Sequence, residues 1–236
     1  MSKQTLPAQS RYGWRWLLVL TGMLAWVSIG CNPQFLSMAL MPFNDGRIPP
    51  EYKLFAADKE LTLAIMTNFA RPETDPDLQA ADADFAEQVA AAFQQRCKEN
   101  KHKVKIVPYA QVRSQQLKQQ LGGGVLSPVD LGKTLKADFV LDLTINSLSL
   151  YEKNYHPQMY RGKADVAINL YKVEVKDESH KVFGKEFRRI HPRDSGPIDA
   201  GSFSASAYRT LFLGKVASDV SKMFIAYDDK EKHVME

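Results

Sequence analysis

The segment that most restricts the fold runs from Phe139 to Leu150, where apolar and polar residues alternate. Apolar side chains at every second position belong to a strand that buries one face and leaves the other polar. The alternation slips by one position after Asn146, and an extra residue at Asn146–Ser147 accounts for the slip as a β-bulge. The sequence therefore predicts a long strand with one apolar face, bulged at Asn146–Ser147.

The segments around this strand show strand and helix patterns in turn. The expected strands are 61–67, 103–108, 163–175 and 181–190, and the expected helices are 82–98, 109–120, 128–135 and 204–227. Phe85, Val89 and Phe93 recur at four-residue steps, as on the buried face of a helix. Early crossovers through helices imply parallel strands and late hairpins imply antiparallel ones. The order β-α-β-α-α-β-β-β-α thus predicts a single mixed α/β domain, with a mixed parallel and antiparallel sheet packed with helices.

Composition divides the chain into four parts. Residues 1–30 have the pattern of a signal peptide, 31–58 form a partly apolar tether, 59–228 form the α/β domain, and 229–236 form a charged tail. Within the tether, Phe35–Phe43 is mostly apolar and Pro49–Pro50 stiffens the backbone. We therefore expect the tether to dock, either on the domain or at the membrane interface.

The N-terminal region has the composition of a bacterial export signal. Trp16–Gly30 offers 15 positions in a mostly apolar run, whereas a membrane-spanning helix needs about 20 residues. Lys3, Arg11 and Arg15 precede or begin this run, and no acid occurs before it. Cleavage as a signal peptide is the leading interpretation, and an uncleaved single-pass anchor carrying the same domain is the alternative.

The end of the apolar run resembles the lipobox of bacterial lipoproteins. In Ser28-Ile29-Gly30-Cys31 a small residue precedes the cysteine, although Ser28 stands where leucine is usual. The resemblance implies cleavage between Gly30 and Cys31 and lipidation of Cys31, which would anchor the protein to a membrane through acyl chains such as palmitate. Asn32 follows the cysteine where aspartate would favour the inner membrane, so the outer membrane is the preferred location, with the domain in the periplasm.

The charge of the chain argues against binding of nucleic acid. The net charge is +4, but residues 1–30 hold three basic residues and no acid, so 28 basic residues face 27 acidic ones after cleavage. A general nucleic-acid binder needs an excess of lysine and arginine to displace counterions from phosphates. The basic clusters 96–105 and 185–193 are interpreted as solvated turn and strand faces.

A nucleotide site is also excluded. Gly132-Lys133-Thr134 matches the end of a phosphate-binding loop, but Ser127 occupies the position of the required glycine. A phosphate-binding loop must leave a strand and open a helix, whereas Lys133 lies near the end of a helix that leads into a strand. We therefore expect no nucleotide.

Residues with chemical potential are few and scattered. No two of the five histidines are three or four residues apart, so no helix presents a pair to a metal. His191 stands near Asp194 and Ser195, a group that we interpret as a surface loop. Cys97 lacks a partner if Cys31 is acylated, and its position predicts a buried, inert thiol. No catalytic, cofactor-binding or metal residue is predicted.

One hairpin loop has a composition suited to protein contact. It contains two tyrosines, a histidine and a methionine, namely Tyr155, His156, Met159 and Tyr160. Aromatic residues and methionine are enriched at protein interfaces. Ordinary packing at the end of the sheet is the alternative for these residues.

The order of elements resembles the periplasmic domain family that includes CsgG, LpoB and the N-terminal domain of TolB. The resemblance rests on Asp130–Leu150, "DLGKTLKADFVLDLTINSLSL", followed by "ADVAINLYKVEV" and "KVFGKEF". It implies a non-enzymatic envelope lipoprotein, an adaptor or assembly factor that binds other envelope proteins, with its oligomeric state open. The membrane-spanning hairpins of the curli pore are missing, so a pore is not implied. The rival hypotheses are an envelope hydrolase with a site assembled from distant residues and a solute-binding protein.

Overall fold

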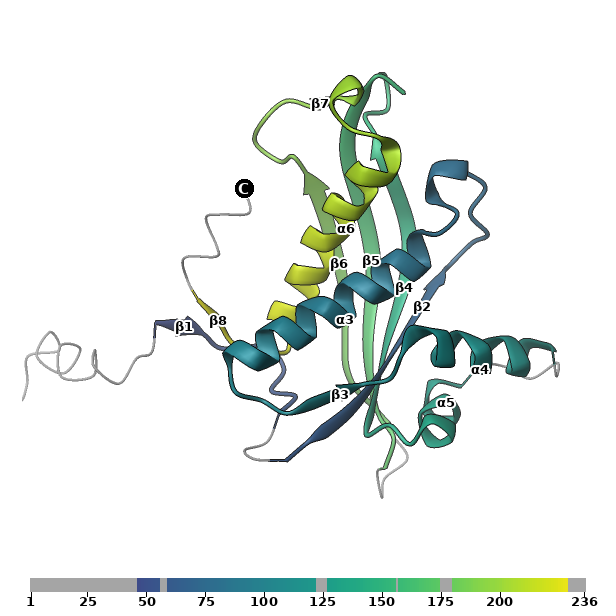
Figure 1. The fold of residues 1–236 in the computed structure, drawn as a ribbon, viewed down its shortest axis with the longest axis vertical. Helices are drawn as coiled ribbons and strands as arrows, with labels where there is room; N and C mark the ends of the chain where they lie inside the picture. Colours follow the sequence, from purple (N-terminus) through teal and green to yellow (C-terminus); the bar gives the residue numbers. More distant parts are fainter. Residues whose placement is uncertain (1–45, 56–58, 122–126, 156, 175–179, 229–236) are drawn as a thin grey trace, which may run out of the picture. The chain divides into compact units, whose positions relative to one another are not determined.

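A six-stranded sheet forms the centre of the computed structural model (Figure 1), which describes residues 46–55, 59–121, 127–155, 157–174 and 180–228. The strands lie in the order β3-β2-β4-β5-β6, and β7 pairs with β5. Their bounds are β2 Leu61–Phe69, β3 Val104–Ile106, β4 Phe139–Tyr151, β5 Met159–Lys172, β6 Lys181–His191 and β7 Ile198–Asp199. β2 is parallel to β3 and β4, while β5 is antiparallel to β4, β6 and β7. The predicted mixed α/β class is confirmed.

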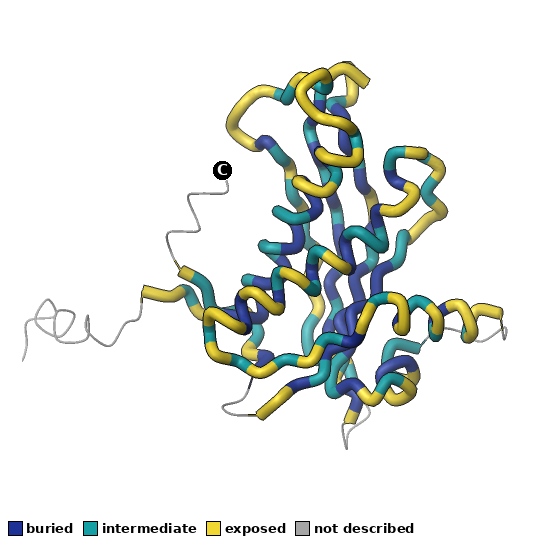
Figure 2. The backbone as a smooth tube through the Cα atoms, viewed as in Figure 1, coloured by how far each residue is buried: buried dark blue, intermediate teal, exposed yellow. Residues whose placement is uncertain are grey.

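Helices pack on both faces of this sheet. α3 (Ala81–Glu99) and α6 (Ala205–Lys222) pack on one face of the sheet and form the main apolar cluster with it. Both helices lie in front of the sheet in Figure 1. α4 (Tyr109–Leu121) and α5 (Pro128–Leu135) supply a smaller cluster on the other face. Two 3-10 turns, η2 (Pro76–Leu78) and η3 (Ala200–Ser202), complete the described helical segments. Buried residues concentrate where the helices meet the sheet (Figure 2).

The bulge predicted in the long strand is present. β4 pairs with β5 in one register up to Ile145 opposite Val166, and in a shifted register from Ser147 opposite Asp165. The extra residue returns Leu148 and Leu150 to the buried face, where 9% and 1% of their surface is exposed. The inserted residue therefore keeps the second half of the strand in contact with the same core, and a further register shift follows between Ser149 and Tyr151.

The C-terminal helix is shorter than the sequence pattern predicts. α6 ends at Lys222 rather than at Tyr227. Tyr227–Asp228 instead forms β8, which pairs antiparallel with β1 (Arg47–Ile48). The apolar residues Phe224 and Ile225, which continue the helical pattern, are buried in the core from the turn that follows the helix. Burial rather than helix formation explains their apolar character.

The domain begins before the boundary expected at residue 59. The described residues from Arg47 on belong to one compact unit. Leu54 and Phe55 are 5% and 4% exposed, and the Tyr52 amide donates a hydrogen bond to the carbonyl of Met223 at 2.9 Å. The part of the expected tether from residue 47 to 55 is thus packed on the domain, whereas Phe35–Phe43 lies outside the described residues.

Candidate functional site

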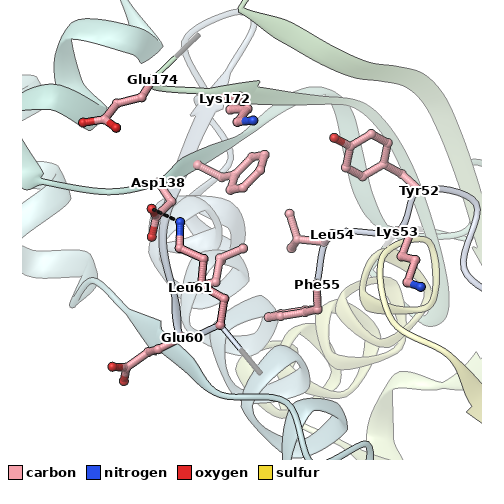
Figure 3. A pocket seen from close by; sticks show the side chains of 11 residues that line it. Tyr52, Lys53, Leu54, Phe55, Glu60, Leu61, Asp138, Lys172 and Glu174 are labelled. Carbon is pink, nitrogen blue, oxygen red and sulfur yellow. Dashed lines mark ion pairs between the residues drawn. The ribbon is translucent and has the colours of Figure 1, made fainter. Parts of the chain in front are cut away.

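A pocket of about 690 Å³ opens at the end of the sheet where β2 and β4 begin and β5 ends (Figure 3). We call it the basal pocket. It is lined by Tyr52, Lys53, Leu54, Phe55, Lys59, Glu60, Leu61, Asp138, Phe139, Lys172 and Glu174. The segment before β2 therefore supplies one wall and the strand ends supply the other.

The basal pocket combines an apolar wall with charges of both signs. Leu54, Phe55 and Leu61 are buried, and three lysines and three acids occur among the lining residues. Asp138 is held in place because its carboxylate accepts a hydrogen bond from the Thr62 amide at 2.7 Å. The carboxylate also lies 3.8 Å from the Lys59 ammonium, an ion pair drawn as a dashed line in Figure 3. Among the described residues that line this pocket, none is a serine, cysteine or histidine. Such a lining is suited to an apolar group flanked by charges.

The hairpin residues expected to make protein contacts do not form one surface. Tyr155 is 55% exposed and Met159 is half-buried. Tyr160 is only 3% exposed, and its ring stacks on Tyr151 and Tyr208 with centroid distances of 5.1 and 4.4 Å. For Tyr160 the structure agrees with the alternative of ordinary packing at the end of the sheet, because the rings of Tyr151 and Tyr208 stack against it. His156 lies outside the described residues, as do Gly30 and Cys31.

Each described histidine has its own surroundings. His102 stacks on Phe55 at 4.7 Å, and the His180 ring lies 3.0 Å from the Lys172 carbonyl oxygen. Burial, with Lys215 and Arg189 nearby, lowers the pKa of His191 to about 4. In the described parts of the chain, no group of three histidine, cysteine or acidic side chains could hold a metal ion.

The cysteine and the loop after His191 agree with their sequence interpretation. Cys97 is a buried free thiol, and burial raises its pKa to about 12, which leaves it protonated and unreactive at neutral pH. Asp194 and Ser195 are exposed, as expected for a surface loop.

Most cations of the two basic clusters are exposed, in agreement with the sequence interpretation, but a few make defined contacts within the fold. Arg96 is 6% exposed, and its Nε donates a hydrogen bond to the Ser221 hydroxyl at 2.7 Å. In the second cluster, Lys185 Nζ lies 2.6 Å from a carboxylate oxygen of Glu51, and Arg189 lies 3.0 Å from Asp219. These cations connect distant segments of the fold, a role that sequence periodicity does not reveal.

A buried carboxyl group, Asp142, was also missed as a special position. It lies on the sheet face that carries α4 and α5, next to Met66 on β2 and Asn169 on β5. It is 8% exposed, and its Oδ1 has no hydrogen-bond partner among the described residues. Burial raises its pKa to about 6, against opposing effects of Asn169 and Lys181. In the sequence, Asp142 is one of several polar residues on the polar face of a strand, and nothing in that pattern indicates that it is buried.

Asp142→Asn is expected to remove a pH-dependent penalty on folding. Because the pKa of Asp142 is higher in the folded state than its ordinary value of 3.8, the folded chain binds more protons between about pH 4 and 6. The free energy of unfolding should therefore fall as the pH rises through this range. The free energy of unfolding of Asp142→Asn, taken relative to that of wild type, should therefore increase by about 1–3 kcal/mol from pH 4 to pH 7.

Urea unfolding of both proteins between pH 4 and 7.5 measures this difference. His191 contributes an opposite trend because its pKa is lowered, but that contribution is common to both proteins and cancels. A stability difference that stays constant with pH would contradict the prediction.

Within the described residues, every helix is too short or too polar to cross a membrane. Comparison with protein-family models gives no match, and comparison with curated protein sequences gives none either. The domain does superimpose in part on solved structures. The mixed α/β fold described above rests on the strand order and helix placement of this chain itself.

Three of these structures come from different bacteria. The PelC dodecamer from Paraburkholderia phytofirmans has 14% identity and a TM-score of 0.41, covering 72% of this chain and 93% of that chain. Lipoprotein GNA1162 from Neisseria meningitidis has 13% identity and a TM-score of 0.38, covering 68% and 96%. The LpoB C-terminal domain from Salmonella enterica has 14% identity and a TM-score of 0.28, covering 57% and 87%. Similarities at this level carry no functional argument, so function must be argued from the residues.

Proposed function

We propose that this chain is a lipid-anchored protein of the bacterial cell envelope that acts by binding other proteins and not by catalysis. The anchor is Cys31, preceded by the lipobox-like residues Ser28-Ile29-Gly30. The α/β domain then faces the periplasm, with the outer membrane as the preferred site of anchoring. Its role is that of an adaptor or assembly factor.

The observation that carries this proposal is the basal pocket. Above its buried apolar wall, the half-buried rings of Tyr52 and Phe139 leave area for a hydrophobic contact, and lysines and acids lie around that area. Protein interfaces have this arrangement of an apolar centre and a polar rim. Serine, cysteine and histidine, which form the common nucleophile–base pairs of hydrolases, do not occur among the described residues that line this pocket.

Site-specific photo-crosslinking in the full-length chain tests the proposal. A photo-reactive amino acid at Lys53, an exposed lining residue of the basal pocket, should give a discrete covalent adduct with an envelope protein. The matched control is the same substitution at Lys133, which is exposed on α5 and outside the pocket lining. We expect at least a tenfold stronger adduct from residue 53. Equal adducts from both positions, or none from residue 53, would contradict the binding role.

The mass of the mature N-terminal peptide from the same membranes tests the anchor. An acylated peptide that begins at Cys31 is expected, and Cys31→Ser should abolish it and release the protein from the membrane fraction. An intact N-terminus in the wild type would instead identify Trp16–Gly30 as a retained anchor and overturn the lipoprotein assignment.

A further inference from the structure

The last strand of the sheet has an unpaired edge. β6 is eleven residues long and pairs with β5 on one side. No described strand pairs with its other side. A long unpaired edge presents a row of backbone donors and acceptors that can pair with another strand.

The backbone groups that face this edge follow from the hydrogen bonds of β5. The amide of Lys172 donates to His180 at 2.8 Å, towards β6, and the amide of Val173 donates to Asp138 at 3.0 Å, towards β4. Even-numbered residues of β5 therefore face β6, since consecutive residues of a strand point in opposite directions. The residues opposite them on β6 are Phe183, Lys185, Phe187 and Arg189.

The alternate residues between Gly184 and Ile190 direct their backbone groups to the free edge. They are Gly184, Glu186, Arg188 and Ile190, and all four are exposed. Their side chains lie on the face of the sheet opposite α6, because side chains alternate along a strand. Ile190 is 44% exposed, which is unusual for a large apolar side chain in this domain.

We propose that two copies of this chain associate through their β6 edges, antiparallel and about a two-fold axis at Phe187. In this register Glu186 of each copy lies opposite Arg188 of the other, so the pair occurs two times. Gly184 of each copy lies opposite Ile190 of the other. Each of these pairs joins residues whose backbone groups face the edge, so all of them can be hydrogen-bonded pairs. The β6 edge is thus complementary to itself in both hydrogen bonding and charge.

Charge selects this register over its neighbours. A two-fold axis at Glu186 would place that carboxylate opposite its own copy, and an axis at Arg188 would do the same with two guanidinium groups. Like charges directly opposite each other destabilise a strand pair. The axis at Phe187 avoids both contacts on the exposed face, and Glu186 of the second copy would share Arg188 with Asp165, whose carboxylate lies 2.7 Å from Arg188 Nε in the same chain.

On the face towards α6, the same register brings Lys185 opposite Arg189 of the second copy. Charged residues that point inward at an edge normally prevent such pairing. Here both cations are neutralised within their own chain. Lys185 Nζ lies 2.6 and 2.8 Å from the two carboxylate oxygens of Glu51, and Arg189 lies 3.0 Å from Asp219. The obstacle to pairing is therefore reduced by contacts already present in one copy.

Cysteine crosslinking of the full-length protein tests the register. A cysteine at Phe187 would lie opposite its own copy, at a Cα separation of about 4.5 Å that permits a disulfide. A cysteine at Ile190 would lie about 20 Å from its own copy, at roughly 3.4 Å per residue along the strand. With copper phenanthroline as oxidant, we expect Phe187→Cys to form a disulfide-linked dimer. Ile190→Cys should form at least tenfold less of this dimer. Cys31 and Cys97 are present in both variants, so any crosslink through them appears in both.

A charge exchange tests the contact without touching the core. Glu186→Arg and Arg188→Glu each place like charges opposite each other, so each should raise the dimer dissociation constant at least tenfold in sedimentation equilibrium. The double variant E186R/R188E restores opposite charges and should return the constant to within threefold of wild type. Thermal unfolding of each variant checks folding, because Glu186 and Arg188 also contact Asn146 and Asp165 within the chain.

Three outcomes would overturn the proposal. They are a wild-type protein that remains monomeric at micromolar concentration, equal crosslinking at positions 187 and 190, and a double variant as weak as the single ones. A monomer whose β6 edge captures a strand of another protein would give the first of these outcomes.

Discussion

Tyr208→Phe is expected to lower the free energy of unfolding by about 2–4 kcal/mol, although the two side chains differ by one oxygen. Tyr208 is fully buried in the first turn of α6. Its hydroxyl accepts a hydrogen bond from the Gly162 amide at 2.9 Å and donates one to the His191 carbonyl at 2.6 Å. Phenylalanine would leave both backbone groups without their partner, at about 1–3 kcal/mol each.

Urea unfolding of Tyr208→Phe at pH 7 measures this cost. Tyr155→Phe is the matched control, because Tyr155 is 55% exposed and water can replace any contact of its hydroxyl. The control should differ from wild type by less than about 0.5 kcal/mol. If both variants proved equally stable, the bridge between β5 and β6 through Tyr208 would not contribute as argued.

Phe212→Ala is expected to cost more, about 3–5 kcal/mol, because it empties a fully buried position between α6 and the sheet. A cavity in a close-packed interior loses both the transfer free energy of the side chain and the contacts of its neighbours. Thermal and urea unfolding both report this loss.

Gly162 provides an internal check on this position. A Cβ atom at Gly162 would lie 2.6 Å from the Phe212 ring, so Gly162→Ala alone should cost about 1–3 kcal/mol through overpacking. In the Phe212→Ala background the ring is absent and the added methyl group partly fills the cavity. The double variant should therefore be at least about 1 kcal/mol more stable than the sum of the single effects predicts. If the effects of Gly162→Ala and Phe212→Ala on the free energy of unfolding were strictly additive, the Phe212 ring would not be the reason for a glycine at position 162.

These positions explain how the molecule keeps its sheet in register. The stacked rings of Tyr151, Tyr160 and Tyr208 join β4, β5 and α6 at the end of the sheet opposite the basal pocket. The basal pocket, by contrast, is built from strand ends and from the segment before β2. The stacked tyrosines and the basal pocket thus lie at opposite ends of the sheet, and variants of one can be tested separately from variants of the other.

The amino-acid sequence alone determined those features that depend on near neighbours in the chain. The alternation from Phe139 to Leu150 predicted both β4 and its bulge, which the register between Ile145 and Ser147 confirms. The four-residue spacing of Phe85, Val89 and Phe93 predicted α3, and all three side chains are buried. Periodicity of this kind reflects local backbone geometry, which is the same in every fold.

The tertiary structure alone decided which polar and aromatic residues are buried, and with which partners. The sequence left open whether Tyr160 lies at a surface or packs, and it stacks in the core. Arg96 was assigned to a solvated cluster and donates a hydrogen bond to the hydroxyl of Ser221, and Asp142 was placed on a polar face and is covered. Arg96 and Ser221 are separated by 125 positions in the chain. The same holds for the pairing of β1 with β8 and for the basal pocket, whose residues come from three separate segments. Burial of a polar group depends on partners brought close by folding, and no pattern of near neighbours records where those partners will lie.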